Sequence, residues 1–256
     1  VAPSQDMVLG IYYMTSVKPN GAGTGKRFAS VDEVIMSAEN GYIGWQSVIK
    51  VNSPKDSFKP GEFKAGDLIE TTAGRLRFNA EMPDEVGYVN EQMGDKKLKA
   101  MIETVYHKQG AWITIKMLDA IKACGYKNAT FFGATLSMDD ILIPAEKKPM
   151  VDEANKQVEE IVKQYSMGQI TGEERYNKVT DIWQRTNEKL TDIMYKNMSK
   201  DKDGFNTIFM MANSGARGSK KQISQLAAMR GLMAKPNGDI IELPVRSNFK
   251  EGLSVI

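Results

Sequence analysis

The chain is 256 residues long and 41% of its residues are hydrophobic, which is enough for a sizeable folded core. A formal net charge of +2 gives no electrostatic reason to expect a dedicated nucleic-acid-binding surface. A single cysteine, Cys124, excludes an intramolecular disulfide and a thiolate-rich metal site, and a single histidine, His107, leaves little scope for imidazole ligands. We therefore expect neither a metal site nor a catalytic residue in this chain.

The sequence contains no membrane or secretion signal. No run approaches the roughly 18 to 20 apolar residues that a membrane span requires. Val1-Ala2-Pro3-Ser4 lacks the charged and then apolar pattern of a signal peptide. These features predict a cytoplasmic protein. The first residue is not Met and the last are Gly252-Leu253-Ser254-Val255-Ile256, so we expect a fragment of a longer chain.

Residues 1–96 are predicted to be mostly β. The apolar runs at residues 7–13 and 47–51 are separated by Gly, Pro and Asn, as strands usually are. Residues 67–81 are predicted to form two further strands around Ala73-Gly74.

Helices are predicted in two places before residue 147. Ser30 followed by Glu33 is a capping box for a helix over residues 31–39. Over residues 97–146 the hydrophobic period becomes helical. Two helices there, ending at Gly110 and at Cys124-Gly125, are marked by Leu98, Met101, Ile102, Val105, Ile113, Met117, Leu118 and Ile121.

Two short motifs suggest chemistry but are interpreted as structural. The glycine-rich run 21–26, ending at Lys26, lacks the spacing of a Walker loop, and Arg27-Phe28 follows where a helix should begin. A flexible surface loop is the favoured interpretation. The adjacent pairs Asp139-Asp140 and Glu173-Glu174 do not aim two carboxylates at one ion. We expect Asp139 or Asp140 to cap a turn.

The clearest pattern lies in residues 147–198, where apolar residues recur at alternating intervals of three and four, as in a coiled coil. This seam consists of Val151, Ala154, Val158, Ile161 and Tyr165 in one arm, and Tyr176, Val179, Trp183, Thr186, Leu190 and Ile193 in the other. A short link predicts two antiparallel helices about 27 to 30 Å long. The narrow seam and charged outer faces favour a protruding hairpin over one packed on its own domain.

The last part, residues 199–256, places one cation among small residues. Arg217 lies in Asn213-Ser214-Gly215-Ala216-Arg217-Gly218-Ser219, where its guanidinium could reach phosphate oxygens; an exposed arginine in a glycine-rich turn is the alternative. A short helix should follow, with Ile223 and Leu226 on its buried side and Gln222, Gln225 and Met229 away from it. Residues 235–239 predict a hairpin turn before a strand at Ile240-Ile241.

The run from Met210 to Ser219, together with residues 222–238, closely resembles the bacterial RNA polymerase β′ subunit family. Further segments agree in the order in which the family has them, and the resemblance covers essentially the whole chain. These segments are Pro3 to Thr15, Thr71-Thr72-Ala73-Gly74-Arg75, Asp139-Asp140-Ile141-Leu142-Ile143-Pro144, Glu174 to Trp183 and Ser247-Asn248-Phe249-Lys250-Glu251-Gly252-Leu253.

The resemblance implies an interior piece of the subunit that forms the pore and funnel of the secondary channel, through which nucleotides enter. The family's aspartate motif for the catalytic magnesium is absent, so the piece alone should be inactive, and magnesium and zinc are expected elsewhere in the full subunit. Implied partners are the β, α and ω subunits, with DNA and RNA only in the whole enzyme. Transcript-cleavage and stringent-response factors would dock on the rim helices, residues 147–198.

The resemblance also implies roles for single residues. Residues Arg217, Gln5 and Met211 would contact the incoming nucleotide or the 3′ end of backtracked RNA. Residues Gln222 and Arg230 would support the F-loop, in the part of the chain (199–256) that leads to the bridge helix. At the rim tip, the residues expected to dock factors are Glu173, Glu174 and Asn177.

Two other classes of function are considered. One is a free-standing coiled-coil adaptor that binds transcription factors. The other is a small phosphate-binding enzyme built around Arg217 and Lys26, which predicts saturable nucleotide binding by the isolated chain.

Overall fold

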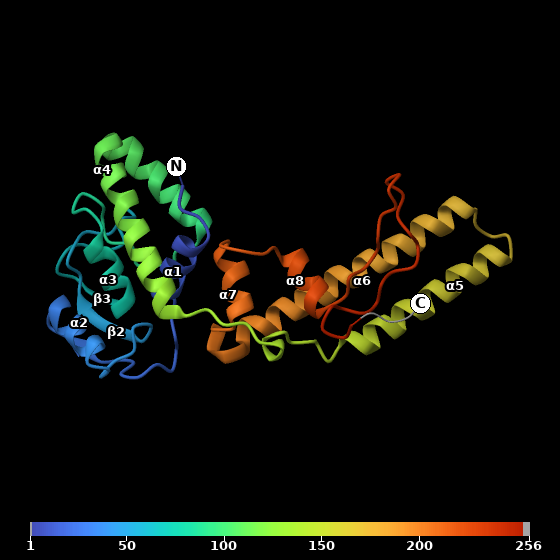
Figure 1. Ribbon diagram of the computed structural model, residues 1–256, viewed down its shortest axis with the longest axis horizontal. Coiled ribbons are helices and arrows are strands. Elements are labelled where there is room, and N and C mark those ends of the chain that lie inside the picture. Colours follow the sequence, from blue (N-terminus) through green and yellow to red (C-terminus); the bar gives the residue numbers. More distant parts are fainter. Residues whose placement is uncertain (1, 253–256) are drawn as a thin grey trace. The chain divides into compact units, whose positions relative to one another are not determined.

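A computed structural model describes residues 2–252 (Figure 1). The chain forms two compact units. The N-terminal unit ends at Thr135 and also includes Met210–Arg217; the hairpin unit comprises Leu136–Phe209 and the residues from Gly218 onward. With helices and a small sheet in one chain, the α+β class is confirmed, but residues 1–96, predicted to be mostly β, contain more helix than strand. In chain order the elements are α1 (Asp6–Thr15), β1 (Arg27–Phe28), α2 (Val31–Glu39), β2 (Val48–Asn52), β3 (Leu68–Thr72), α3 (Ala73–Glu81), α4 (Asp95–Phe132), η1 (Met138–Asp140), α5 (Lys147–Ser166), α6 (Gly172–Lys200), η2 (Asp201–Gly204), α7 (Thr207–Ser214) and α8 (Lys220–Ala227).

The sheet of the N-terminal unit has the order β1-β2-β3, with β1 parallel and β3 antiparallel to β2. Ile49 and Val51 alternate with exposed Lys50, and Val51 lies opposite Ile69 of β3. This period of two buries one face of the sheet in a cluster that includes Val34 of α2. The predicted strand at 47–51, the first strand of 67–81 and the helix at 31–39 are confirmed.

The strand predicted at residues 7–13 is wrong, because these residues form α1. Val8, Leu9, Gly10, Ile11 and Tyr12 are all buried. A helix that is covered on every side has no polar face, so its sequence shows no helical period. In Figure 1, α1 lies against α4. A Cβ on Gly10 would stand 1.9 Å from the carbonyl oxygen of Gly125, so the two backbones touch.

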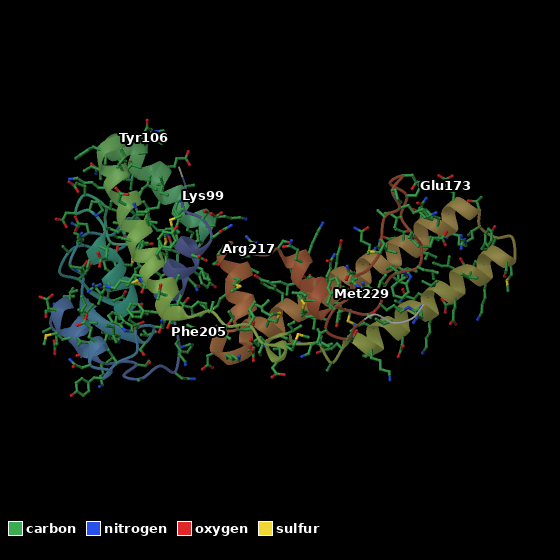
Figure 2. The ribbon with its side chains drawn as sticks, in the orientation of Figure 1. Lys99, Tyr106, Glu173, Phe205, Arg217 and Met229 are labelled. Atoms are coloured by element: carbon green, nitrogen blue, oxygen red, sulfur yellow. The ribbon has the colours of Figure 1, made fainter. Side chains whose placement is uncertain are left out.

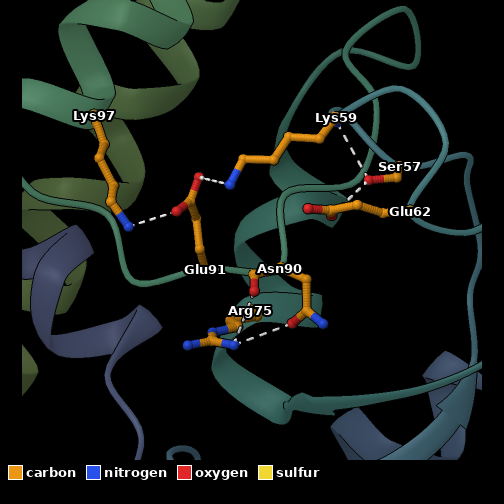
Figure 3. A network of polar contacts seen from close by, with 7 residues as sticks. All are labelled: Ser57, Lys59, Glu62, Arg75, Asn90, Glu91 and Lys97. Atoms are coloured by element: carbon orange, nitrogen blue, oxygen red, sulfur yellow. Dashed lines mark hydrogen bonds and ion pairs between the residues drawn. The ribbon is translucent and has the colours of Figure 1, made fainter.

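The second strand predicted within residues 67–81 is also wrong, because Thr72 caps a helix, α3, by accepting from the amide of Arg75 at 3.2 Å. The Arg75 Nε donates to the carbonyl of Thr15 at 3.1 Å, and its Nη1 donates to Asn90 (Figure 3). Burial lowers the pKa of this guanidinium. Arg75 thereby ties α1 and α3 to the segment before α4.

Helix α4 bends at Gly110, whose φ of 79° marks the break predicted between two helices. The second half does not end at Cys124-Gly125 as predicted but continues to Phe132, where Gly133 caps it in the left-handed conformation. Gly125 belongs inside the helix because its missing side chain lets α1 approach. The main core of this unit gathers residues of α1, α3, α4 and the segment between α3 and α4: Val8, Ile11, Phe78, Met93, Leu98, Met101, Met117 and Ile121.

The hairpin unit is built on α5 and α6, which pair along the predicted seam (Figure 1). Val151, Ala154, Val179, Trp183 and Leu190 are buried, which confirms these positions of the seam, whereas the predicted Ile193 is only partly buried beside the fully buried Met194. Toward the tip the burial falls, and Tyr165 is 46% exposed.

The base of the hairpin unit is held by a buried carboxylate. Asp140 accepts from the amide of Ser137 in a capping box and forms an ion pair with Lys202. These hydrogen bonds, that of Lys202 first, lower the pKa of Asp140. Asn206 donates to the Asp140 carbonyl at 2.9 Å. The prediction that Asp139 or Asp140 caps a turn is confirmed for Asp140.

The segment after α8 differs in part from the sequence prediction. Met229, expected away from the buried side of a helix, lies beyond α8 and is fully buried, whereas Ile223 is buried as predicted. The turn at 235–239 is present, with the Lys235 amide donating to Asp239 at 2.7 Å. Only isolated bridges follow it, Ala234 to Ile240 and Gly231 to Val245, instead of a strand.

Candidate functional site

Arg217 is presented by a turn between two glycines. Gly215 and Gly218 have φ of 78° and 82°, a region that favours glycine, and the Arg217 amide donates to the carbonyl of Met211 at 3.2 Å. The Arg217 side chain is exposed, and no residue between 2 and 252 forms a hydrogen bond or ion pair with its guanidinium. The backbone is therefore fixed while the cation is available to a ligand.

The segment that carries this turn is anchored to the N-terminal unit. Asn213 donates to the hydroxyl of Tyr12 on α1 at 2.6 Å, and burial raises the pKa of that hydroxyl. A Cβ on Gly94 would lie 3.1 Å from the carbonyl oxygen of Ser214, so the turn passes close to the start of α4. Met210 is fully buried. Sequence reasoning missed Tyr12, because its partner is about 200 residues away.

The two other residues predicted near the nucleotide lie in the same unit. Met211 is half-buried beneath the turn, and Gln5 is exposed at the start of α1. Gln5 has φ 48° and ψ −116°, a strained conformation for a residue with a side chain. The structure shows no direct contact between Gln5 and Arg217 within the part of the chain that it describes.

Lys26 does not stand in a phosphate loop. The glycine-rich run before it is held by turn hydrogen bonds and by Gly25, whose amide donates to Val48 at 2.7 Å. β1 follows Lys26, so there is no helix N-terminus to receive a phosphate. Residues 21–26 thus form a surface loop, as expected, with several turns; its flexibility stays a prediction.

The three residues predicted to dock factors are exposed at the tip of the hairpin, where Figure 2 shows Glu173. Glu174 has a structural contact: its Oε2 accepts from the Thr171 amide at 2.9 Å, and Thr171 Oγ1 accepts from the Glu174 amide at 3.2 Å. This capping box fixes the start of α6. Glu173 and Asn177 are exposed, and their side chains form no hydrogen bond or ion pair with residues 2–252.

The tip also carries contacts that the sequence did not reveal. Arg175 Nη2 donates to Glu242 Oε1 at 2.8 Å, and its guanidinium lies 5.2 Å from the centre of the Tyr165 ring. Tyr176 donates to the carbonyl of Ile240 at 3.2 Å. These contacts fasten the loop around the 235–239 turn to the outer part of α6. Only the charge of Arg175 could have suggested them.

The two residues predicted to support the F-loop have local contacts. Gln222 completes a capping box with Ser219, its Oε1 accepting from the Ser219 amide at 2.8 Å. The guanidinium of Arg230 lies 5.0 Å from the centre of the Phe249 ring. Helix α8 is joined to α6 by a hydrogen bond of 2.6 Å between Ser224 and Thr191. Their predicted roles stay predictions.

The described part of the chain, residues 2–252, has no group of three or more His, Cys, Asp or Glu side chains that could bind a metal ion. Within that range no helix has both the length and the apolar character needed to cross a membrane.

Comparisons with known proteins agree over the whole chain. The family described as "RNA polymerase Rpb1, domain 3" matches residues 1–141, and "RNA polymerase Rpb1, domain 4" matches residues 170–250. The DNA-directed RNA polymerase subunit beta' of Treponema pallidum (strain Nichols) is 57% identical over 258 residues, that of Treponema denticola 52% over 257 residues, and that of Borrelia hermsii 50% over 256 residues. The alignments cover 100% of this chain and 18% of each relative, so the chain spans less than a fifth of their length. The chain belongs to the RNA polymerase Rpb1 family and is similar over its full length to part of the bacterial β′ subunit.

Proposed function

We propose that this chain forms part of the wall of the nucleotide entry channel of an RNA polymerase. It would serve DNA-templated RNA synthesis only when assembled with the β, α and ω subunits. The catalytic magnesium would be held by other parts of the subunit, and the isolated chain, given magnesium, template, primer and nucleotides, would not extend RNA. A chain that did extend RNA would contradict this proposal.

The exposed and unpaired guanidinium of Arg217 is the observation that carries the proposal. Two glycines and the contacts of Asn213 and Ser214 fix its backbone, and among residues 2–252 no carboxylate forms an ion pair with it; the nearby Asp95 is paired with Lys99. An arginine placed in this way can donate to the phosphate oxygens of a passing nucleotide. It supplies positive charge without proton transfer, as a channel wall requires.

The test uses polymerase assembled with full-length β′ subunit in which Arg217 is changed to Ala or to Lys. Losing a charged hydrogen bond to phosphate should raise the apparent KM for nucleotides about tenfold in Arg217→Ala. Lysine keeps the positive charge but cannot bind two oxygens at once, so in Arg217→Lys the apparent KM should rise less than in Arg217→Ala. The matched control is Arg185→Ala, because the Arg185 side chain is 72% exposed and pairs only with Asp181. An unchanged KM in both Arg217 variants would refute the assigned role.

We infer that the hairpin tip is the docking surface for transcript-cleavage and stringent-response factors. The tip offers exposed polar groups at Glu173 and Asn177, and the link between its helices carries apolar Met167, which is 71% exposed. Its shape is set locally by the Thr171 capping box and by Gly168, whose φ of 71° closes the link between the helices. Because contacts within the tip fix its shape, the tip can bind a partner without rearrangement.

The docking test is a calorimetric titration with a cleavage factor. Glu173→Ala and Asn177→Ala should each weaken binding with unchanged helix content, whereas Glu174→Ala also removes the hydrogen bond that Glu174 accepts from the Thr171 amide in the capping box. Glu188→Ala is the control, because this residue is exposed on α6 far from the tip. If Glu173→Ala and Glu188→Ala bind equally well, the tip is not the docking surface.

A further inference from the structure

A cavity of about 390 Å³ lies inside the N-terminal unit, away from the Arg217 turn. Its floor is formed by Met14 of α1 and Cys124 of α4, which are 4% and 5% exposed. Tyr13 and Trp45 line its walls, and Phe131 lies at its mouth with 71% of its surface exposed. The volume falls in the range of small-molecule sites, about 300 to 1,000 Å³. Three aromatic rings around an apolar floor suit a flat apolar group.

Four charged side chains border this cavity, and two of them already form an ion pair. Arg77 Nε and Glu81 Oε1 lie 3.2 Å apart on α3 and neutralise each other. Glu39 and Lys127 are exposed, and neither has a hydrogen bond or ion pair among residues 2–252. Glu39 is also the last residue of α2, where the carbonyl end of the helix repels a carboxylate. A cation bound there would relieve this repulsion.

From this pattern we propose that the cavity binds a small zwitterion with a flat apolar body, such as an aromatic amino acid. The ring lies between Tyr13 and Trp45, the ammonium group meets Glu39, and the carboxylate meets Lys127. An uncharged ring would leave both side chains unpaired. A ligand with one charge would satisfy only one of them.

The test uses Cys124 as a reporter, because it is the only cysteine of the chain and lies on the cavity floor. Burial raises the pKa of its thiol to about 11, so alkylation by iodoacetamide is slow and is best followed by mass spectrometry at about pH 9. A bound ligand covers the thiol. L-Tryptophan at about 10 mM should slow alkylation several-fold. Tryptamine and indole-3-propionate each lack one of the two charges, so each should need an about tenfold higher concentration to slow alkylation equally.

Variants assign the two charges. In Glu39→Gln, L-tryptophan should slow the alkylation of Cys124 no more than indole-3-propionate does. In Lys127→Met, it should slow alkylation no more than tryptamine does. Lys122→Met is the control, since Lys122 lies on the same helix and is paired with Asp119. In this variant L-tryptophan should protect Cys124 as well as it does in the unchanged chain. Protection by indole equal to that by L-tryptophan, protection that survives both variants, or no protection by any probe would each overturn the proposal.

Discussion

The crossing of α1 and α4 makes a quantitative prediction for Gly10→Ala. The added methyl carbon would stand 1.9 Å from the carbonyl oxygen of Gly125 and 2.7 Å from the amide nitrogen of Ala129. Both are backbone atoms, so no side chain can turn away. An ordinary contact of about 3.3 Å requires the helices to separate by about 1.4 Å. Val8 and Ile11 of α1, both fully buried, would then lose contact with the α4 side of the core.

We expect a net loss of about 2 to 3 kcal/mol from the free energy of unfolding of the N-terminal unit. Overpacking costs about 1 to 3 kcal/mol, and here it should exceed that range because the backbone cannot yield. The better helix propensity of alanine returns about 1 kcal/mol. The unfolding temperature of this unit should therefore fall by about 5 to 10 °C.

Scanning calorimetry of the chain with and without Gly10→Ala measures this difference. Gly172→Ala is the matched control, because a Cβ at that helical glycine meets only Tyr165 at 3.9 Å and should leave stability nearly unchanged. If Gly10→Ala unfolds within about 1 °C of the unchanged chain, the helices do not touch as described and the reasoning fails.

Two further changes test the hairpin unit. Because its contacts lower the pKa of Asp140, the stability that its carboxylate contributes is complete above its unfolded pKa of about 3.9 and is lost as the pH falls through the folded value. Asp140→Asn should flatten the acid dependence of the unfolding temperature, and an unchanged acid profile would contradict this assignment. Arg175→Met removes the half-buried ion pair with Glu242, worth about 1 kcal/mol, so hydrogen exchange of amides 231–245 should accelerate about fivefold. The exposed pair of Arg185 provides the control, and equal exchange in Arg175→Met and Arg185→Met would show that the loop is held by other contacts.

The sequence predicted the hairpin well because one narrow stripe of apolar residues on two otherwise charged helices is a strong periodic signal. It predicted α1 wrongly for the opposite reason. Successive residues from Val8 to Tyr12 are all buried, so the pattern looks like a buried strand. The sequence pattern marks Gly74 and Gly125 as breaks, but both lie inside helices. A Cβ on Gly74 would stand 2.0 Å from the carbonyl oxygen of Met14, so its absence serves packing.

The candidate site was predictable only in its local parts. The glycines around Arg217 indicated a turn with an available cation, and the structure has one. The ion pair of Arg175 with Glu242 joins residues 67 positions apart, and no local pattern reports such a pairing. The charges around the cavity between α1, α2, α3 and α4 come from three helices that pack only in the folded unit. Groups of residues that are distant in the sequence can be recognised only when the packing of the helices is known.

The buried seam and the exposed tip of the hairpin should differ in the substitutions that they tolerate during evolution. Trp183 and Leu190 in the buried seam maintain the pairing of the two helices, whereas Glu173 and Asn177 at the tip take no part in it. Charge at the tip can therefore change by single substitutions without loss of stability. If the tip docks partner proteins as proposed above, lineages that share this hairpin can change those partners without changing its fold. Substitutions in the seam, by contrast, should be tolerated only where another side chain compensates.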